Sequence, residues 1–153
     1  RNPEIVLNTL CQHSKVSDYK FERLYRILFN KEMFFIAYQR IYAKPGNMTP
    51  GTDGQTIDQM SIGRIERLIE TLGMNPTSRI LLKGVYTKEE RQETPLGIPS
   101  VEDKLVQEVV RMILEAIYEG HFESTSHGFR PHKSCHTALT SIQKDFTGAK
   151  LFR

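Results

Sequence analysis

The chain has 153 residues, with 21 Lys and Arg against 18 Asp and Glu, so its formal net charge is +3, and 39% of its residues are hydrophobic. This length suits a single domain with a core of its own. Charged residues interrupt every hydrophobic run before it reaches the roughly 18 residues that a membrane span needs, which excludes a transmembrane protein. The two cysteines, Cys11 and Cys135, cannot form the disulfide framework of a small secreted domain. We therefore expect an intracellular protein.

The charges are unevenly distributed along the chain. Residues 15–44 contain seven basic and three acidic side chains, and residues 126–153 contain five and one. Two positive segments separated by neutral or acidic ones are typical of a protein that binds a polyanion along a groove. Solvated helix faces would give the same pattern, so the charge alone leaves both interpretations open.

The periodicity of apolar residues predicts a mostly helical chain of the α+β class. Helices are expected over residues 18–29, 31–43, 62–72, 101–118 and 135–144. An antiparallel β hairpin is expected over residues 79–99, and a further strand starts near residue 149. Between the second and third helices, residues 44–54 are rich in Gly, Pro, Asn and Asp and predict a long irregular loop, a kind of loop that is usually functional or disordered.

Two clusters carry residue types found in metal and acid–base sites. His132 and His136 lie one helical turn apart beside Cys135, but a structural zinc site needs four ligands and Cys11 is in no C-x-x-C pair. The adjacent glutamates at 89–90 suit a solvated hairpin tip better than acid–base catalysis. The motifs of serine hydrolases and of nucleotide-binding loops do not occur in the sequence. The sequence thus indicates no metal site and no catalytic residue in this chain.

Three blocks in a fixed order are the most specific signals. They are YAKPGNMTPGTDG at 42–54, PLGIPS with DKLVQ at 95–107, and HGFRP at 127–131. With these blocks the chain resembles the fingers region of group II intron reverse transcriptases, the intron-encoded maturases of bacteria and organelles. The glycines of the first two blocks would also let the backbone lie close to a phosphate chain, although tight turns without a ligand would need the same residues.

The resemblance implies the fingers subdomain of a right-hand reverse transcriptase and the start of its palm. Such a protein grips an RNA template paired with a DNA primer and binds its group II intron RNA to assist splicing. The residues that it implies along the nucleic-acid backbone are Lys44, Asn47, Thr49, Gly51, Thr52, Lys104 and Arg130. Those that it implies near the nucleotide and template are Lys88, Arg91, Leu96, Ile98 and Pro99.

The resemblance also bears on catalysis. In this family two Mg²⁺ ions are held by palm aspartates, the first of them in the strand expected near residue 149, and the sequence stops before that aspartate. We therefore expect this chain to hold no cofactor and to be inactive alone, whereas a full-length enzyme would use Mg²⁺ for RNA-directed DNA synthesis. Thr94 stands where the family usually has an Arg that pairs with the triphosphate, which argues against nucleotide binding.

The expected organisation is a leader at 1–17, a fingers domain at 18–125 and a fingers-to-palm segment at 126–153, with the natural protein continuing beyond. The first hypothesis is an RNA-binding fingers fragment of a bacterial, cytoplasmic protein, with intron RNA and template–primer as partners and no membrane. The second is a structural module that self-associates, as a homodimer for example, without binding RNA by itself.

Overall fold

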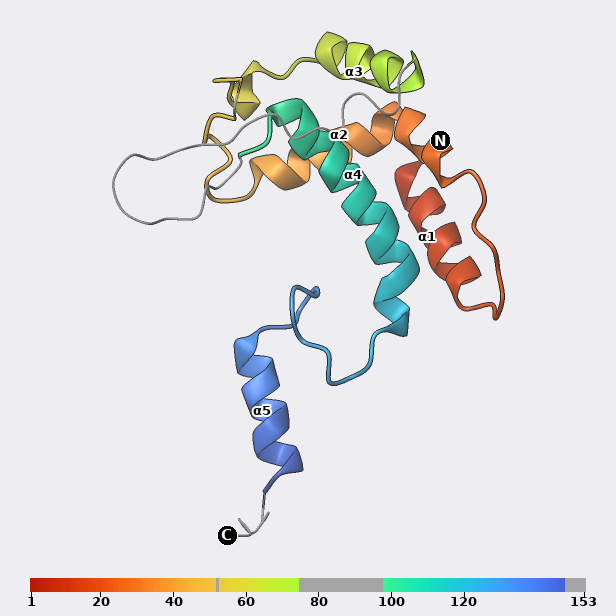
Figure 1. The fold of residues 1–153 in the computed structure, drawn as a ribbon, viewed down its shortest axis with the longest axis vertical. Coiled ribbons are helices and arrows are strands. Elements are labelled where there is room, and N and C mark those ends of the chain that lie inside the picture. Colours follow the sequence, from red (N-terminus) through yellow and green to blue (C-terminus); the bar gives the residue numbers. More distant parts are fainter. Residues whose placement is uncertain (52, 75–97, 148–153) are drawn as a thin grey trace.

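The computed structural model describes residues 1–51, 53–74 and 98–147 of the chain. Its elements in chain order are α1 (Pro3–Ser14), the 3-10 helix η1 (Leu24–Phe29), α2 (Lys31–Tyr42), the 3-10 helix η2 (Ile57–Gln59), α3 (Ile62–Met74), α4 (Val101–Tyr118), the 3-10 helix η3 (Glu119–His121) and α5 (Cys135–Asp145). The helix α4 is the axis of the packing, because both α1 and α2 lie against it, while α3 contacts η1 and α2 (Figure 1).

The start of α4 is fixed by local hydrogen bonding. The Ser100 hydroxyl accepts a hydrogen bond from the backbone N–H of Asp103 at 3.1 Å, which satisfies one of the free N–H groups at a helix N-terminus. Apolar side chains then recur at helical spacing, and Leu105 and Val109 are completely buried. The predicted helix at 101–118 is confirmed to the residue.

The helix α2 supplies the other half of the core. Its N-cap is Asn30, whose side chain accepts from the backbone N–H of Glu32 at 3.2 Å. Met33, Phe34 and Ala37 point inward and have no exposed surface. Together with residues of α1, α3 and α4 they form one hydrophobic cluster, which holds α2 and α4 side by side.

The expected α+β class is wrong for the described residues, since every regular element in residues 1–51, 53–74 and 98–147 is a helix and none is a strand. The hairpin predicted at 79–99 and the strand predicted near residue 149 lie outside the described residues, apart from Ile98 and Pro99. These two residues lead into the cap of α4 without strand structure. Pro99 has no N–H to donate to a strand neighbour, which is the physical reason that this end of the segment is irregular.

Two differences concern the first 30 residues. Residues 1–17, where no element was expected, contain α1, whose start is capped by the side chain of Asn2. The helix predicted at 18–29 is reduced to η1, because Asp18 (φ 62°) and Arg23 (φ 57°) have left-handed backbone conformations. A left-handed residue cannot continue a right-handed helix.

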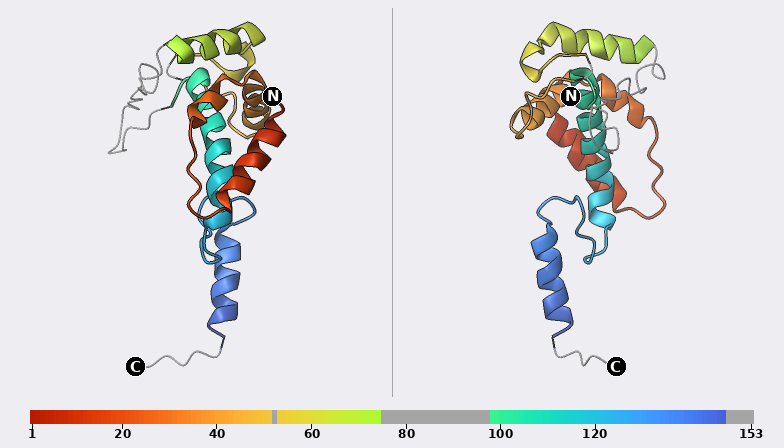
Figure 2. Two further views of the ribbon diagram at one scale, coloured as in Figure 1. Left: turned by 90° about the vertical axis from the view of Figure 1, so that its right-hand side faces the viewer. Right: turned by 60° about the vertical axis from the view of Figure 1, so that its left-hand side comes forward.

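The helix α5 extends away from the rest of the molecule (Figures 1 and 2). Its start at Ser134 has a capping box with Thr137, in agreement with the predicted helix start. None of its residues is buried. Among the described residues, no helix is both long enough and apolar enough to cross a membrane.

Candidate functional site

The loop that follows α2 lies against the first turn of α4. The Lys104 ammonium on α4 donates a hydrogen bond to the carbonyl oxygen of Thr49 in the loop at 3.1 Å. Within the loop, the side-chain amide of Asn47 donates to the carbonyl oxygen of Tyr42, the last residue of α2, at 2.6 Å. These contacts give the irregular loop a defined path from the end of α2 to the start of α4.

The loop approaches the residues just before α4 closely at Gly51. This residue is buried, and a Cβ atom placed on it would lie 2.6 Å from the carbonyl oxygen of Pro99 and 2.8 Å from the Cα atom of Ser100. Both neighbours are backbone atoms, so no side-chain rotation can relieve the overlap. The glycine is therefore required by a close approach of two backbones.

A buried carboxylate lies beneath the beginning of the loop. The Glu108 side chain on α4 is only 7% exposed, and its Oε1 accepts from Arg111 Nη2 at 2.6 Å. Its Oε2 accepts from Arg111 Nε at 2.9 Å and lies 3.5 Å from Lys44 Nζ. This two-pronged guanidinium–carboxylate pair has the geometry of the stronger kind of ion pair. Glu108 thus joins the end of α2 to the middle of α4.

The cations around Glu108 decide its ionisation. Burial alone would raise the pKa of the Glu108 carboxyl, but the hydrogen bond from Arg111 and the charges of Arg111, Lys44 and Arg40 outweigh it, and the pKa lies below its ordinary value. Glu108 is consequently ionised at neutral pH, and it orients two of the cations without cancelling all of their charge.

The charge of Lys104 remains available. Its hydrogen-bond partner in the loop is an uncharged carbonyl, and no carboxylate is paired with it among the described residues. Arg40 is exposed and likewise has no ion pair within the described part of the chain. An ammonium or guanidinium without a carboxylate partner can bind a phosphate oxygen with its full charge.

The structure brings together most of the described residues that the family resemblance implied for contact with the nucleic-acid backbone. Lys44, Asn47, Thr49 and Gly51 follow one another in the loop, and Lys104 binds this loop from α4. Of the residues implied near the nucleotide and template, Pro99 lies next to Gly51: its carbonyl oxygen is 2.6 Å from where a Cβ atom on Gly51 would lie. Ile98 is the residue before Pro99. Thr52, Lys88, Arg91 and Leu96 lie outside the described residues.

Arg130 lies in a different place. Its guanidinium pairs with the Glu119 carboxylate at 2.9 Å and donates to the carbonyl oxygens of Glu123 at 2.9 Å and Ser126 at 2.8 Å. The side chain is 12% exposed, so these groups already occupy its donors. Glu119 follows the last residue of α4 and is 15 positions after Lys104, which corresponds to a rise of about 22 Å along the helix at 1.5 Å per residue. Arg130 thus holds the turn after α4 in its folded form.

The sequence interpretation missed Glu108, Arg111 and Arg40. A signal for the first two was present, because Lys104, Glu108 and Arg111 follow at spacings of four and three residues, which places them along one side of a helix. The burial of Glu108 could not be read from that spacing. Among the described residues, no group of three or more His, Cys, Asp or Glu side chains could hold a metal ion, so the donors for the Mg²⁺ pair implied by the resemblance are not found there.

The fold and this surface define a small helical module with four cations, which lie at the end of α2, in the following loop and within the first eleven residues of α4. No family model matches the chain. Individual proteins do match: the group II intron-encoded protein LtrA of Lactococcus lactis subsp. cremoris is 41% identical over 150 residues, which are 96% of this chain and 25% of that protein.

Two further relatives come from eukaryotes. An uncharacterized 91 kDa protein in the cob intron of Schizosaccharomyces pombe is 46% identical over 126 residues, 79% of this chain and 15% of that protein. Nuclear intron maturase 1, mitochondrial, of Arabidopsis thaliana is 46% identical over 50 residues, 33% of this chain and 7% of that protein. The chain belongs to the group II intron-encoded reverse transcriptase/maturase family, and it spans about a quarter of the length of LtrA.

Replacing Gly51 by Ala tests the close approach. The added methyl group would overlap backbone atoms on the α4 side, and we expect the free energy of unfolding to fall by about 1–3 kcal/mol, as overpacking usually costs. Thermal or urea unfolding measures this. The matched control is Gly63→Ala in α3, where an added Cβ meets nothing within 4 Å and helix propensity favours Ala by up to about 1 kcal/mol. Equal stability of the two variants would contradict the packing described.

The lowered pKa of Glu108 predicts acid sensitivity. Because the pKa of Glu108 in the folded protein lies below its ordinary value of 4.5, the ion pair contributes stability above that pH, and this stability is lost as the pH falls through the folded pKa. The difference in Tm between wild type and Glu108→Gln should therefore shrink as the pH is lowered from about 5 to about 3. The exposed Glu70→Gln change in α3 is the control. A difference for Glu108→Gln that stays constant over this range would show that the ion pair is not formed.

Proposed function

We propose that this chain is an RNA-binding fingers portion of a group II intron-encoded reverse transcriptase/maturase, and that it holds RNA by its sugar–phosphate backbone. The contact surface in this proposal is the loop at residues 44–51 together with the first turns of α4. The proposal rests on the environment of Lys104. Its ammonium donates a hydrogen bond to a carbonyl oxygen of the loop and is not paired with a carboxylate among the described residues.

The surface has the properties that backbone binding requires. Lys44 and Thr49 are exposed, so cationic and hydroxyl groups are open to solvent beside the backbone of the loop. Contacts to phosphate and sugar come from such side chains and from backbone N–H groups, and they fix orientation without reading the base sequence. Because the loop is fastened at Lys104 and Gly51, its groups lose little conformational freedom on binding.

In a full-length protein of this family, the same surface would lie along an RNA template paired with a DNA primer, and along the intron RNA during splicing assistance. DNA synthesis there would depend on Mg²⁺ held by residues that are not among those described. The relative from Lactococcus lactis supports a bacterial protein, for which we expect a cytoplasmic location.

A second candidate function rests on α5. Leu139, Ile142 and Phe146 follow at spacings of three and four residues and are 63%, 54% and 66% exposed. Contiguous exposed apolar surface marks interaction sites, whereas apolar residues exposed singly are normal. The spacing of these three residues favours the structural alternative, in which copies of the chain associate, as in a homodimer, without a role for RNA.

The salt dependence of RNA binding tests the first candidate. In a filter-binding titration with a structured group II intron RNA, the logarithm of the binding constant should fall linearly with the logarithm of the salt concentration. The slope of this plot is negative, with a magnitude of roughly 0.7 to 0.9 for each phosphate neutralised. Replacing Lys104 by Gln removes one such contact, so we expect the slope to become shallower by about that amount.

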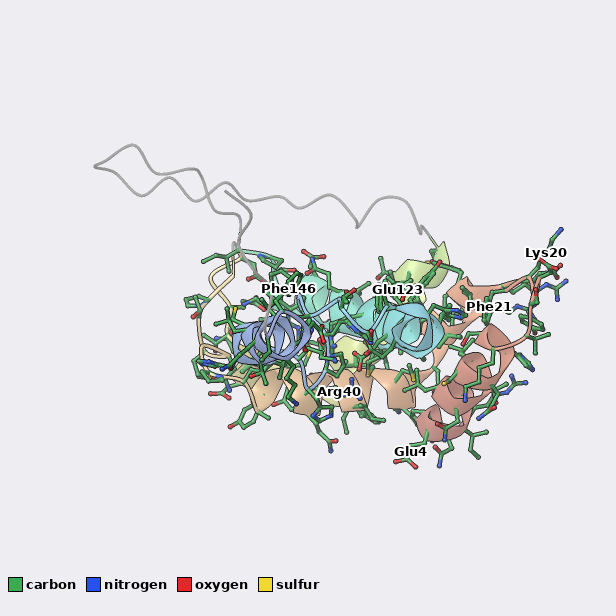
Figure 3. The ribbon with its side chains drawn as sticks, turned by 90° about the horizontal axis from the view of Figure 1, so that it is seen from below. Glu4, Lys20, Phe21, Arg40, Glu123 and Phe146 are labelled. Carbon is green, nitrogen blue, oxygen red and sulfur yellow. The ribbon has the colours of Figure 1, made fainter. Side chains whose placement is uncertain are left out.

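The matched control is Lys20→Gln, a loss of the same charge at an exposed residue that lies far from Arg40 (Figure 3). Its slope should equal that of the wild type. If Lys104→Gln and Lys20→Gln change the slope by the same amount, with unchanged Tm, RNA does not bind at the assigned surface. An absence of RNA binding at low salt, together with self-association in light scattering, would contradict the proposal and favour the second candidate.

A further inference from the structure

Two cations from two segments contact the carboxylate of Glu108. Arg111 approaches it from the next turn of α4, and Lys44 from the residues after α2. The charge of Arg40, four residues before Lys44, also lowers the pKa of the Glu108 carboxyl. Figure 3 shows Arg40 on the α2 side of the molecule. Together these three residues form what we call the α2–α4 cationic cluster.

The cluster carries more positive than negative charge. Glu108 and Glu115 are the two carboxylates that pair with it, and Glu115 accepts from Arg111 Nη1. Against them stand Arg40, Lys44 and Arg111, with Lys104 one turn before Glu108 on the same helix. These six residues therefore carry four positive charges against two negative ones, even though the group at their centre is a buried acid. Such an excess attracts a polyanion.

The cations also keep donors for a ligand. A guanidinium has five N–H groups, and the contacts of Arg111 use its Nε, Nη2 and Nη1 for three carboxylate oxygens, which leaves two N–H groups. Lys44 has three N–H groups and a single carboxylate neighbour among the described residues. The Lys44 and Arg111 side chains are 57% and 47% exposed, so the remaining donors are accessible to solvent.

The ion pairs restrict these side chains before any ligand arrives. Lys and Arg side chains carry about 2 kcal/mol of rotamer entropy, and a guanidinium held in a fork loses less of it when it forms a further bond. Since the carboxylate of Glu108 is buried and cannot itself reach a ligand in solvent, its role toward a ligand is to hold Lys44 and Arg111 in place. An arrangement of this kind is preorganised for an anion.

We propose that the α2–α4 cationic cluster is a second phosphate-binding site for RNA, continuing the contact at Lys104 toward the middle of α4. This inference rests on the proposed function, because the ligand is the same RNA backbone. It adds Arg40 and Arg111, which neither the motifs nor the resemblance indicated, and it extends the contact along α4. From Lys104 to Arg111 the helix rises by about 10 Å, so the two sites contact different phosphates.

The test compares two arginine variants with a matched control. Arg111→Gln and Arg40→Gln should each make the salt dependence of intron RNA binding shallower by roughly 0.7 to 0.9 on the log–log plot. The control, Arg67→Gln, removes an exposed arginine of α3 that bonds its own helix at the Gly63 carbonyl, and it should leave the slope unchanged. Arg40→Gln is the decisive variant, because it leaves both ion-pair partners of Glu108 in place and so spares the fold.

The outcomes separate this inference from the proposed function. If wild type and Arg67→Gln bind with the same steep salt dependence and Arg40→Gln keeps that slope, the cluster only joins α2 to α4 and the inference is overturned, while RNA binding at Lys104 stands. A fall in Tm for Arg111→Gln with an unchanged slope for Arg40→Gln would likewise overturn the inference. If the wild type does not bind RNA at low salt, the proposed function fails and the inference fails with it.

Discussion

The position of the candidate surface depends on one backbone contact. Gly51 lies so close to Pro99 and Ser100 that no side chain fits between them. This contact ties a loop rich in turn-forming residues to the residue that caps α4. Without it, the loop would be held to α4 by contacts of its side chains and of Lys104: the hydrogen bond from Lys104 and the ion pair of Lys44 with Glu108. Gly51 thus allows the loop and the start of α4 to lie together as one continuous surface.

The arrangement of charges on this surface depends on which side chains are buried, and not only on their order in the sequence. Glu108 is buried and ionised, and it holds Arg111 and Lys44, whereas Lys104 is held by a neutral carbonyl. A carboxylate in this place therefore holds the cations in position, and the ammonium of Lys104 has no carboxylate partner among the described residues. Arg130 serves a different purpose, since its donors are taken up by Glu119 and by two carbonyls of the turn after α4.

Much of the helical framework could be predicted, because its signals are local. Caps at Asn30, Ser100 and Ser134 and the apolar periodicity that follows them identify α2, α4 and α5. The cap at Asn2 with a proline next to it carried the same kind of signal for α1 and was missed. The helix predicted at 18–29 was wrong because left-handed residues, which periodicity does not reveal, interrupt it.

The site was predictable in part. The ordered motifs named the loop and Lys104, and the structure places them in contact. The burial of Glu108 and the approach of Gly51 to Pro99 join segments far apart in sequence, so no local pattern could indicate them. The same holds for Arg130, whose basic side chain is indistinguishable in sequence from one that is free to bind a ligand.

If RNA contacts the loop at residues 44–51 and the first half of α4, the backbone amides there should be protected. Hydrogen–deuterium exchange, measured with and without a structured group II intron RNA, tests this. We expect slower exchange on RNA binding in the loop and at the start of α4, with no change in α5. Slower exchange confined to α5 or to the turn after α4, with the loop unaffected, would contradict it.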